Sequence, residues 1–150
     1  YPRVIVRQSQ VIHSQVIVPT LHFLGQKDFR SANDEFLDAL KDYRKGDYKD
    51  ALTKAGSAFE SVLKIICAKK NWPYQQNDVA SALIKNVLPR TGLENYFEQT
   101  LIIVATLRNR LSSSHGAGTA RKNPPPHLVT YALNVTAANI LLIVEEVGLK

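Results

Sequence analysis

Apolar residues recur at helical spacing in the second quarter of the chain. Between residues 32 and 43 they fall at i, i+4, i+7, i+8 and i+11, which places them on one face of a helix. Gly46 is expected to end this helix, and Asp47 to cap a second helix over residues 48–71. Because the link is so short, we expect the two helices to form an antiparallel hairpin.

The same spacing continues to the C-terminus. NWPY (71–74) should break the second helix, since proline disfavours helical geometry at the residue before it. We expect a short helix over 78–88 that ends at Pro89, and a longer one over 92–111. Glycines and prolines predict a loop over 112–126, followed by a final helix over 127–148. That last helix is apolar on nearly all sides, which is typical of a bundle centre or an interface. The pattern predicts a compact all-α bundle of about five or six helices.

The first 26 residues follow a less regular pattern. Their apolar residues alternate as in strands, yet residues 14–26 could equally form a helix with Pro19 near a kink or boundary. We expect a helix over about 8–25. The predicted organisation is therefore an N-terminal segment, 1–26, packed on one helical domain, 27–150.

The composition is typical of a single globular domain with a positive net charge. The 150 residues are 45% hydrophobic, enough for one buried core, and 19 Lys and Arg against 13 Asp and Glu give a net charge of +6. A polyanionic partner such as nucleic acid fits that charge. The single cysteine, Cys67, rules out a disulfide within the chain and is expected to be a buried packing residue of a cytoplasmic protein.

We expect neither a targeting signal nor a membrane-spanning segment in this sequence. The chain has no methionine, so we expect it to be part of a longer protein. No signal peptide is expected at its start. The most apolar run, 138–144, is too short to span a bilayer, so a soluble domain without membrane contact is predicted.

The stretch LRNRLSSSHGAG (107–118) carries the candidate chemistry. Seven residues make nearly two helical turns, so Arg108 and His115 share a face if the helix persists through the serines. Arg110 converges on His115 only if the helix unwinds at residues 112–114. Histidine exchanges protons near neutral pH, and guanidinium binds phosphate with fixed donors. With the 2′-hydroxyl of RNA as nucleophile, such a pair suits phosphodiester cleavage without metal or cofactor. The alternative is that these cations only complement the negative end of the helix dipole.

Two stretches resemble a known family. LRNRLSSSHGAG is similar to the signature of the HEPN superfamily, in which an arginine and a polar residue precede a histidine after a short gap. The pairing of LRN with HGAG resembles its abortive-infection C-terminal branch. AGSAFESVLKIIC (55–67), with Glu60 and Lys64 one turn apart, is similar to the helix that this branch carries ahead of the motif. The resemblance extends in element order over residues 31–147.

That resemblance implies a HEPN-like bundle that dimerises with two motifs at a shared cleft. It implies a metal-independent endoribonuclease that leaves 2′,3′-cyclic phosphate and 5′-hydroxyl ends, used as a toxin or in phage defence. Arg108 would then bind the scissile phosphate, His115 would be the general acid or base, and Asn109 the adjacent polar residue. Arg110 also precedes His115 by a gap that the HEPN signature allows. The family includes members without catalysis that serve as binding or dimerisation modules.

Other residues are assigned supporting roles, each beside a plainer alternative. Glu60 either pairs with Lys64 on the helix surface or holds Arg108 from the neighbouring helix. His13 and His22 lack carboxylates or cysteines at ligand spacing, so no metal site is expected. The residues expected to contact RNA, unless they are merely solvated, are Arg110, Ser114, Lys64, Arg121 and Lys122.

Three functions fit these expectations. The leading one is a homodimeric nuclease acting on RNA such as tRNA, gated by an antitoxin or by a further domain outside this chain. The second is a catalytically silent module that binds nucleic acid or a nucleotide. The third is a structural dimerisation domain that uses the apolar face of residues 128–147.

Overall fold

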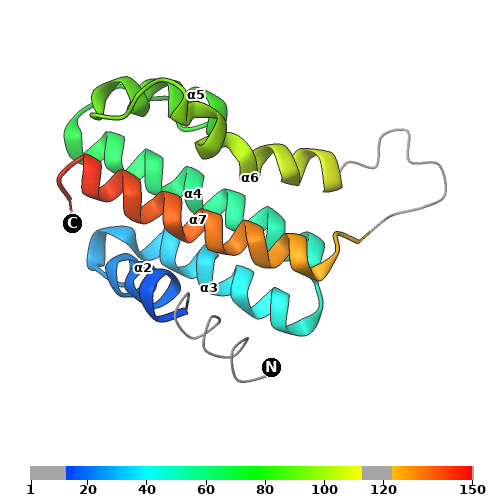
Figure 1. Cartoon of the computed structure of the whole chain (residues 1–150). Coiled ribbons are helices and arrows are strands. Elements are labelled where there is room, and N and C mark those ends of the chain that lie inside the picture. Colours follow the sequence, from blue (N-terminus) through cyan, green and yellow to red (C-terminus); the bar gives the residue numbers. More distant parts are fainter. Residues whose placement is uncertain (1–12, 113–122, 150) are drawn as a thin grey trace.

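The computed structural model describes residues 13–112 and 123–149 as a bundle of helices (Figure 1). No strand occurs in these two ranges, so the predicted all-α class is confirmed. Short η1 (His13–Ile17), η2 (Lys27–Phe29) and η3 (Leu88–Arg90) turns accompany the α-helices. The α-helices are α2 (Val18–Leu24), α3 (Arg30–Lys45), α4 (Tyr48–Lys70), α5 (Ala80–Val87), α6 (Phe97–Ser112) and α7 (Pro126–Glu146).

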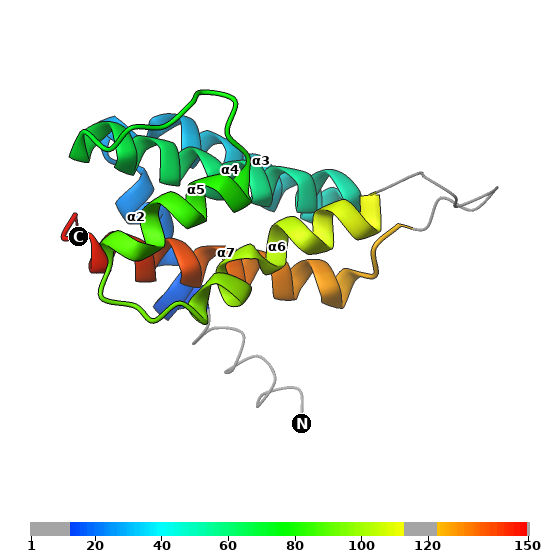
Figure 2. The same ribbon diagram turned by 90° about the horizontal axis from the view of Figure 1, so that it is seen from above.

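Helices α3 and α4 form the predicted antiparallel hairpin, side by side in Figures 1 and 2. Gly46 ends α3 in the left-handed region, with φ of 83°, and its N–H donates to the Tyr43 carbonyl at 3.1 Å. The Asp47 N–H closes the same turn on the Asp42 carbonyl at 2.8 Å. Asp47 is the N-cap residue of α4, as predicted, and its carbonyl accepts a hydrogen bond from the Ala51 N–H at 2.9 Å, but its carboxylate makes no capping hydrogen bond. Asp47 therefore both closes the end of α3 and starts α4.

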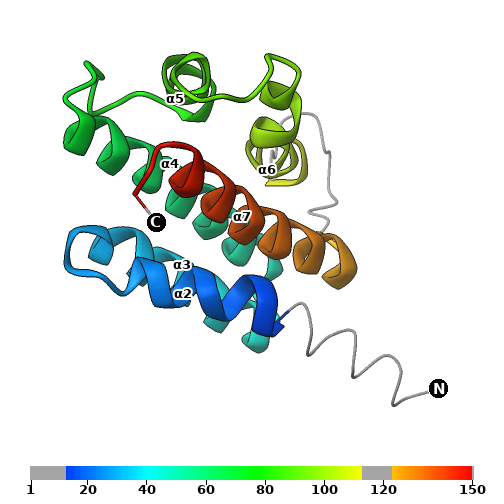
Figure 3. The same cartoon turned by 60° about the vertical axis from the view of Figure 1, so that its left-hand side comes forward.

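The core lies between α4 and the helices around it. Figure 3 shows α2 and α3 on one side of α4 and α7, with α5 and α6 on the other. Phe36 of α3, Leu63 and Ile66 of α4, and Ile140 and Ile143 of α7 are almost completely buried. The final helix was expected in a bundle centre or at an interface; the structure shows it packed within the bundle, with buried residues along its whole length.

Helix α7 is also, by length and composition alone, able to cross a membrane, as one such helix within the described ranges. This corrects the estimate based on residues 138–144, because the helix continues for 21 residues. The core helix of a soluble protein passes the same test, and half of the apolar window in α7 is buried inside the bundle.

The predicted boundaries of α5 and α7 differ from the structure by one or two residues, and larger differences occur at the N-terminus and at the start of α6. Residues 13–24 are helical, so the strand alternative is wrong there, and Pro19 sits at the start of α2; residues 1–12 lie outside the described ranges. Helix α6 begins at Phe97 rather than at Gly92. The Gly92 N–H donates to the Glu146 carboxylate at 3.2 Å, and the Leu93 N–H donates to the Thr91 hydroxyl at 3.1 Å. These contacts satisfy the backbone outside a helix.

Candidate functional site

Arg108 occupies the buried face of α6. Leu101, Val104 and Ala105 are buried at i, i+3 and i+4, and Arg108 follows at i+7. The side chain of Arg108 is 18% exposed and extends from this face toward α4. Arg108 therefore continues the row formed by Leu101 and Val104 into the bundle.

The guanidinium of Arg108 lies against the backbone of α4 at Gly56. Gly56 is buried, and a Cβ atom added there would lie 3.1 Å from Nη1 and 3.5 Å from Cδ of Arg108. Only a residue without a side chain leaves the full width of this space to the arginine. The guanidinium therefore packs directly against the backbone of α4 at Gly56, and this contact surface is called its seat below.

Glu60, one turn further along α4, fixes the other side of the guanidinium. Its Oε2 lies 3.6 Å from Nη2 of Arg108, and its side chain is only 17% exposed. The same Oε2 accepts a hydrogen bond from the Ala80 N–H, the first residue of α5, at 3.1 Å. One carboxylate thus joins α4, α5 and α6 around the arginine.

Of the two roles considered for Glu60, the structure shows the contact with Arg108 from the neighbouring helix. No ion pair between Glu60 and Lys64 forms in the part of the chain that the structure describes. The planar fork of a guanidinium matches the geometry of phosphate, and the ion pair with Glu60 holds that fork between α4 and α6.

The remaining predicted site residues are placed only in part. Asn109 and Arg110 are exposed on α6, and Lys64 is half-buried on α4, one turn beyond Glu60. The residues that lie outside the described ranges are Ser114, His115, Arg121 and Lys122. The structure therefore brings together Arg108 and Glu60, and leaves the arginine–histidine pairing as a prediction.

The described residues contain neither a metal-ligand cluster nor an exposed cysteine. Within the described residues, no three side chains of His, Cys, Asp or Glu gather as they would around a metal ion. Cys67 is fully buried, as predicted, and burial raises the pKa of its thiol above the ordinary value. A thiol held in its neutral form is a poor nucleophile, so Cys67 serves packing.

Residues 30–147 match the family Abi_C, a HEPN-like domain. The chain belongs to this family. The match confirms the resemblance seen in LRNRLSSSHGAG and AGSAFESVLKIIC, and it covers α3 to α7 of the HEPN-like domain, including Gly56, Glu60 and Arg108. No curated protein and no solved structure matches the chain.

Gly56 was not among the residues that the sequence predicted for this HEPN-like site. Its signal was present, because glycine inside a helical pattern lowers helix stability by about 1 kcal/mol relative to alanine and so calls for a reason. Gly56 stands four residues before Glu60 in an otherwise strong helix. Spacing within α4 alone could not name Arg108 as the group that occupies the space.

Proposed function

We propose that this HEPN-like domain is a metal-independent endoribonuclease in which Arg108 and His115 cleave RNA. The observation that carries the proposal is the seating of Arg108. A largely buried arginine held by Glu60 and Gly56 lies at the head of the motif that runs to His115. An arginine that merely complemented a helix dipole would need neither the glycine nor the buried carboxylate.

The proposed reaction uses the 2′-hydroxyl of the RNA as nucleophile. The 2′-oxygen attacks the adjacent phosphorus as its proton leaves, the bond to the 5′-oxygen breaks, and that oxygen takes up a proton. The products are a 2′,3′-cyclic phosphate and a 5′-hydroxyl. Arg108 binds the phosphate and stabilises the negative charge that develops on it, His115 acts as general acid or base, and Asn109 orients the substrate or the imidazole.

The proposal extends to the setting in which the enzyme works. We infer a homodimer with a composite active site, in a cytoplasmic phage-defence or toxin-type protein whose activity is gated by an antitoxin or a further domain. Arg110, Ser114, Arg121 and Lys122 would contact the RNA backbone. Support comes from membership in the HEPN-like family and from the net charge of +6, which favours an RNA partner.

The test is cleavage of total RNA and of tRNA in the presence of EDTA, with analysis of the fragment ends. The wild type is expected to leave cyclic phosphate and 5′-hydroxyl ends. His115→Ala should lower the rate by roughly 100-fold or more, because acid–base catalysis is lost. Arg108→Ala should lower it comparably, because the developing charge loses its partner.

Two matched controls sharpen this test. Arg44→Ala removes an exposed arginine of α3, and His22→Ala removes an exposed histidine of α2; both should retain most activity. Unchanged cleavage by His115→Ala would refute the mechanism. Loss with Arg110→Ala but not with Arg108→Ala would reassign the catalytic arginine. Intact RNA in every sample, with salt-dependent binding that Arg108→Ala weakens, would indicate a silent binding module instead.

A further inference from the structure

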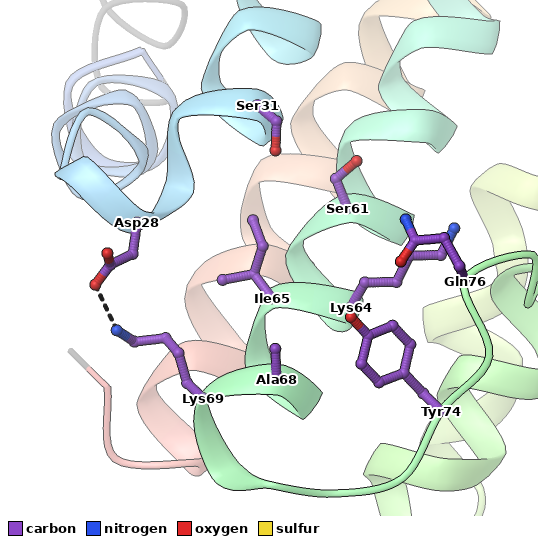
Figure 4. Close-up of a pocket in the computed structure, with 9 residues that line it drawn as sticks. All are labelled: Asp28, Ser31, Ser61, Lys64, Ile65, Ala68, Lys69, Tyr74 and Gln76. Carbon is purple, nitrogen blue, oxygen red and sulfur yellow. Dashed lines mark hydrogen bonds and ion pairs between the residues drawn. The ribbon is translucent and has the colours of Figure 1, made fainter.

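A cavity of about 410 Å³, lined by both polar and apolar side chains, opens on the outer face of α4 (Figure 4). Three segments line it: the start of α3 with the preceding turn, the outer face of α4, and the loop between α4 and α5. Figure 4 shows the Tyr74 ring and the Gln76 amide extending from that loop toward α4. The volume falls in the range of small-molecule sites.

The charge of this cavity is positive. Lys64 and Lys69 both line it, and Asp28 is the one acid among its described lining residues. Asp28 is engaged by Lys69, with Nζ and Oδ2 2.6 Å apart. Lys64 has no ion pair within the described ranges, so its charge is left to attract an anion.

The loop that carries Tyr74 and Gln76 is fixed in position. Asn86 of α5 donates through Nδ2 to the Pro73 carbonyl at 2.7 Å, and the Gln75 N–H donates to Asp78 Oδ2 at 2.9 Å. The end of the loop is held at Ala80 by Glu60. A ring and an amide presented on a fixed loop lose little conformational entropy when they bind a ligand.

We propose that this cavity binds one nucleotide of the RNA strand, next to the nucleotide whose phosphate meets Arg108. Lys64 contacts its phosphate, the Tyr74 ring stacks on its base, and the Gln76 amide hydrogen-bonds to the edge of the base. This inference rests on the proposed function, because it assigns part of the substrate of the same site. Neither Tyr74 nor Gln76 belongs to the arginine–histidine motif.

The cavity and the Arg108 site are physically joined. Lys64 lies one turn beyond Glu60, which is about 6 Å along the axis of α4. Glu60 contacts Arg108 and, through the same oxygen, anchors the end of the loop that carries Tyr74 and Gln76. A strand seated at Arg108 that continues along α4 therefore passes Lys64 before it reaches the cavity.

The experiment measures binding of a fluorescein-labelled, single-stranded oligouridylate to the His115→Ala protein, so that the probe is not cut. Adding Tyr74→Leu, which keeps an apolar side chain but removes the ring, should raise Kd about tenfold. Gln76→Ala should raise it about threefold. Tyr74→Phe keeps the ring, and Gln75→Ala removes the neighbouring exposed glutamine outside the cavity lining; both should bind like the parent.

The outcomes separate this inference from the nuclease assignment. Unchanged Kd for both Tyr74→Leu and Gln76→Ala overturns the cavity proposal, even if wild-type protein cleaves RNA. Weakened binding in a protein that never cleaves RNA supports the cavity and refutes the nuclease alone. Competition by uridine 5′-monophosphate as effective as that by unlabelled oligouridylate would assign the cavity to a free nucleotide and overturn the strand proposal.

Discussion

Arg108 fills a position on α6 where the pattern of buried residues calls for an apolar side chain. Placing a charge there costs desolvation free energy, which is recovered only if the charge has a well-placed partner. Glu60 supplies that partner, and Gly56 supplies the space. Both side chains retain some exposure, at 18% and 17%, so solvent weakens the attraction between the two charges and also lowers the cost of desolvating them. The main effect of Glu60 and Gly56 is therefore to position the guanidinium of Arg108.

Gly56→Ala tests whether that position matters. Alanine favours the helix by roughly 0.5–1 kcal/mol over glycine, so the free energy of unfolding should not fall by more than about 1 kcal/mol. The new Cβ, 3.1 Å from Nη1, should push the guanidinium away from its seat. We expect the rate of RNA cleavage to fall by about tenfold. Urea unfolding of the same sample measures the free energy of unfolding. Ser57→Ala, on the next residue of α4, is the control; equal activity of both variants would contradict the role of Gly56.

At this scale the sequence could name the residues but not their contacts. Arg108 stood out because it begins a recognisable motif, and Glu60 was one of two alternatives. The choice between Lys64 and Arg108 as the partner of Glu60 depends on how α6 lies on α4, which no spacing within one helix determines. Gly56 was missed for the same reason.

Two helices end at residues in the left-handed backbone region. Gly46 and Asn71 both close helices in the left-handed region, with φ of 83° and 58°. Glycine adopts this conformation without steric cost, whereas other residues adopt it less readily. Replacing the glycine at Gly46 should therefore lower stability, whereas introducing a glycine at Asn71 should not.

We expect Gly46→Ala to lower the free energy of unfolding by about 1 kcal/mol, because alanine is strained at positive φ. Asn71→Gly should leave it unchanged or raise it by a few tenths of a kcal/mol. Both values come from urea unfolding followed by circular dichroism. If Gly46→Ala is as stable as the parent, the left-handed end of α3 is not required to turn the chain into α4.

Helix positions followed the apolar pattern well, and helix ends followed it less well. The hairpin of α3 and α4 was predicted because periodicity, Gly46 and the short link all agreed. The start of α6 was not, since residues 92–96 are held outside the helix partly by Glu146, 54 residues away from Gly92. Contacts at such separation leave no local signal.

Across the whole molecule, α7 packs against helices on both sides of the bundle. Its apolar residues pack beside α4, and its buried Asn139 donates to the Thr100 carbonyl of α6 at 3.3 Å. This explains why a helix that is apolar on nearly all sides need not lie in a membrane. It also holds α6, and with it Arg108, in a constant relation to α4.

A composite site makes a prediction that no single-chain site makes. Arg108→Ala and His115→Ala should each be inactive alone, because each lacks one catalytic group. If two motifs share one cleft in a dimer, mixing the variants forms heterodimers whose cleft holds one intact arginine and one intact histidine. Part of the RNA cleavage should then return. Each variant at the same total concentration is the control, and subunit exchange is checked by pull-down with two tags. A mixture that exchanges subunits yet stays inactive would place both groups within one chain.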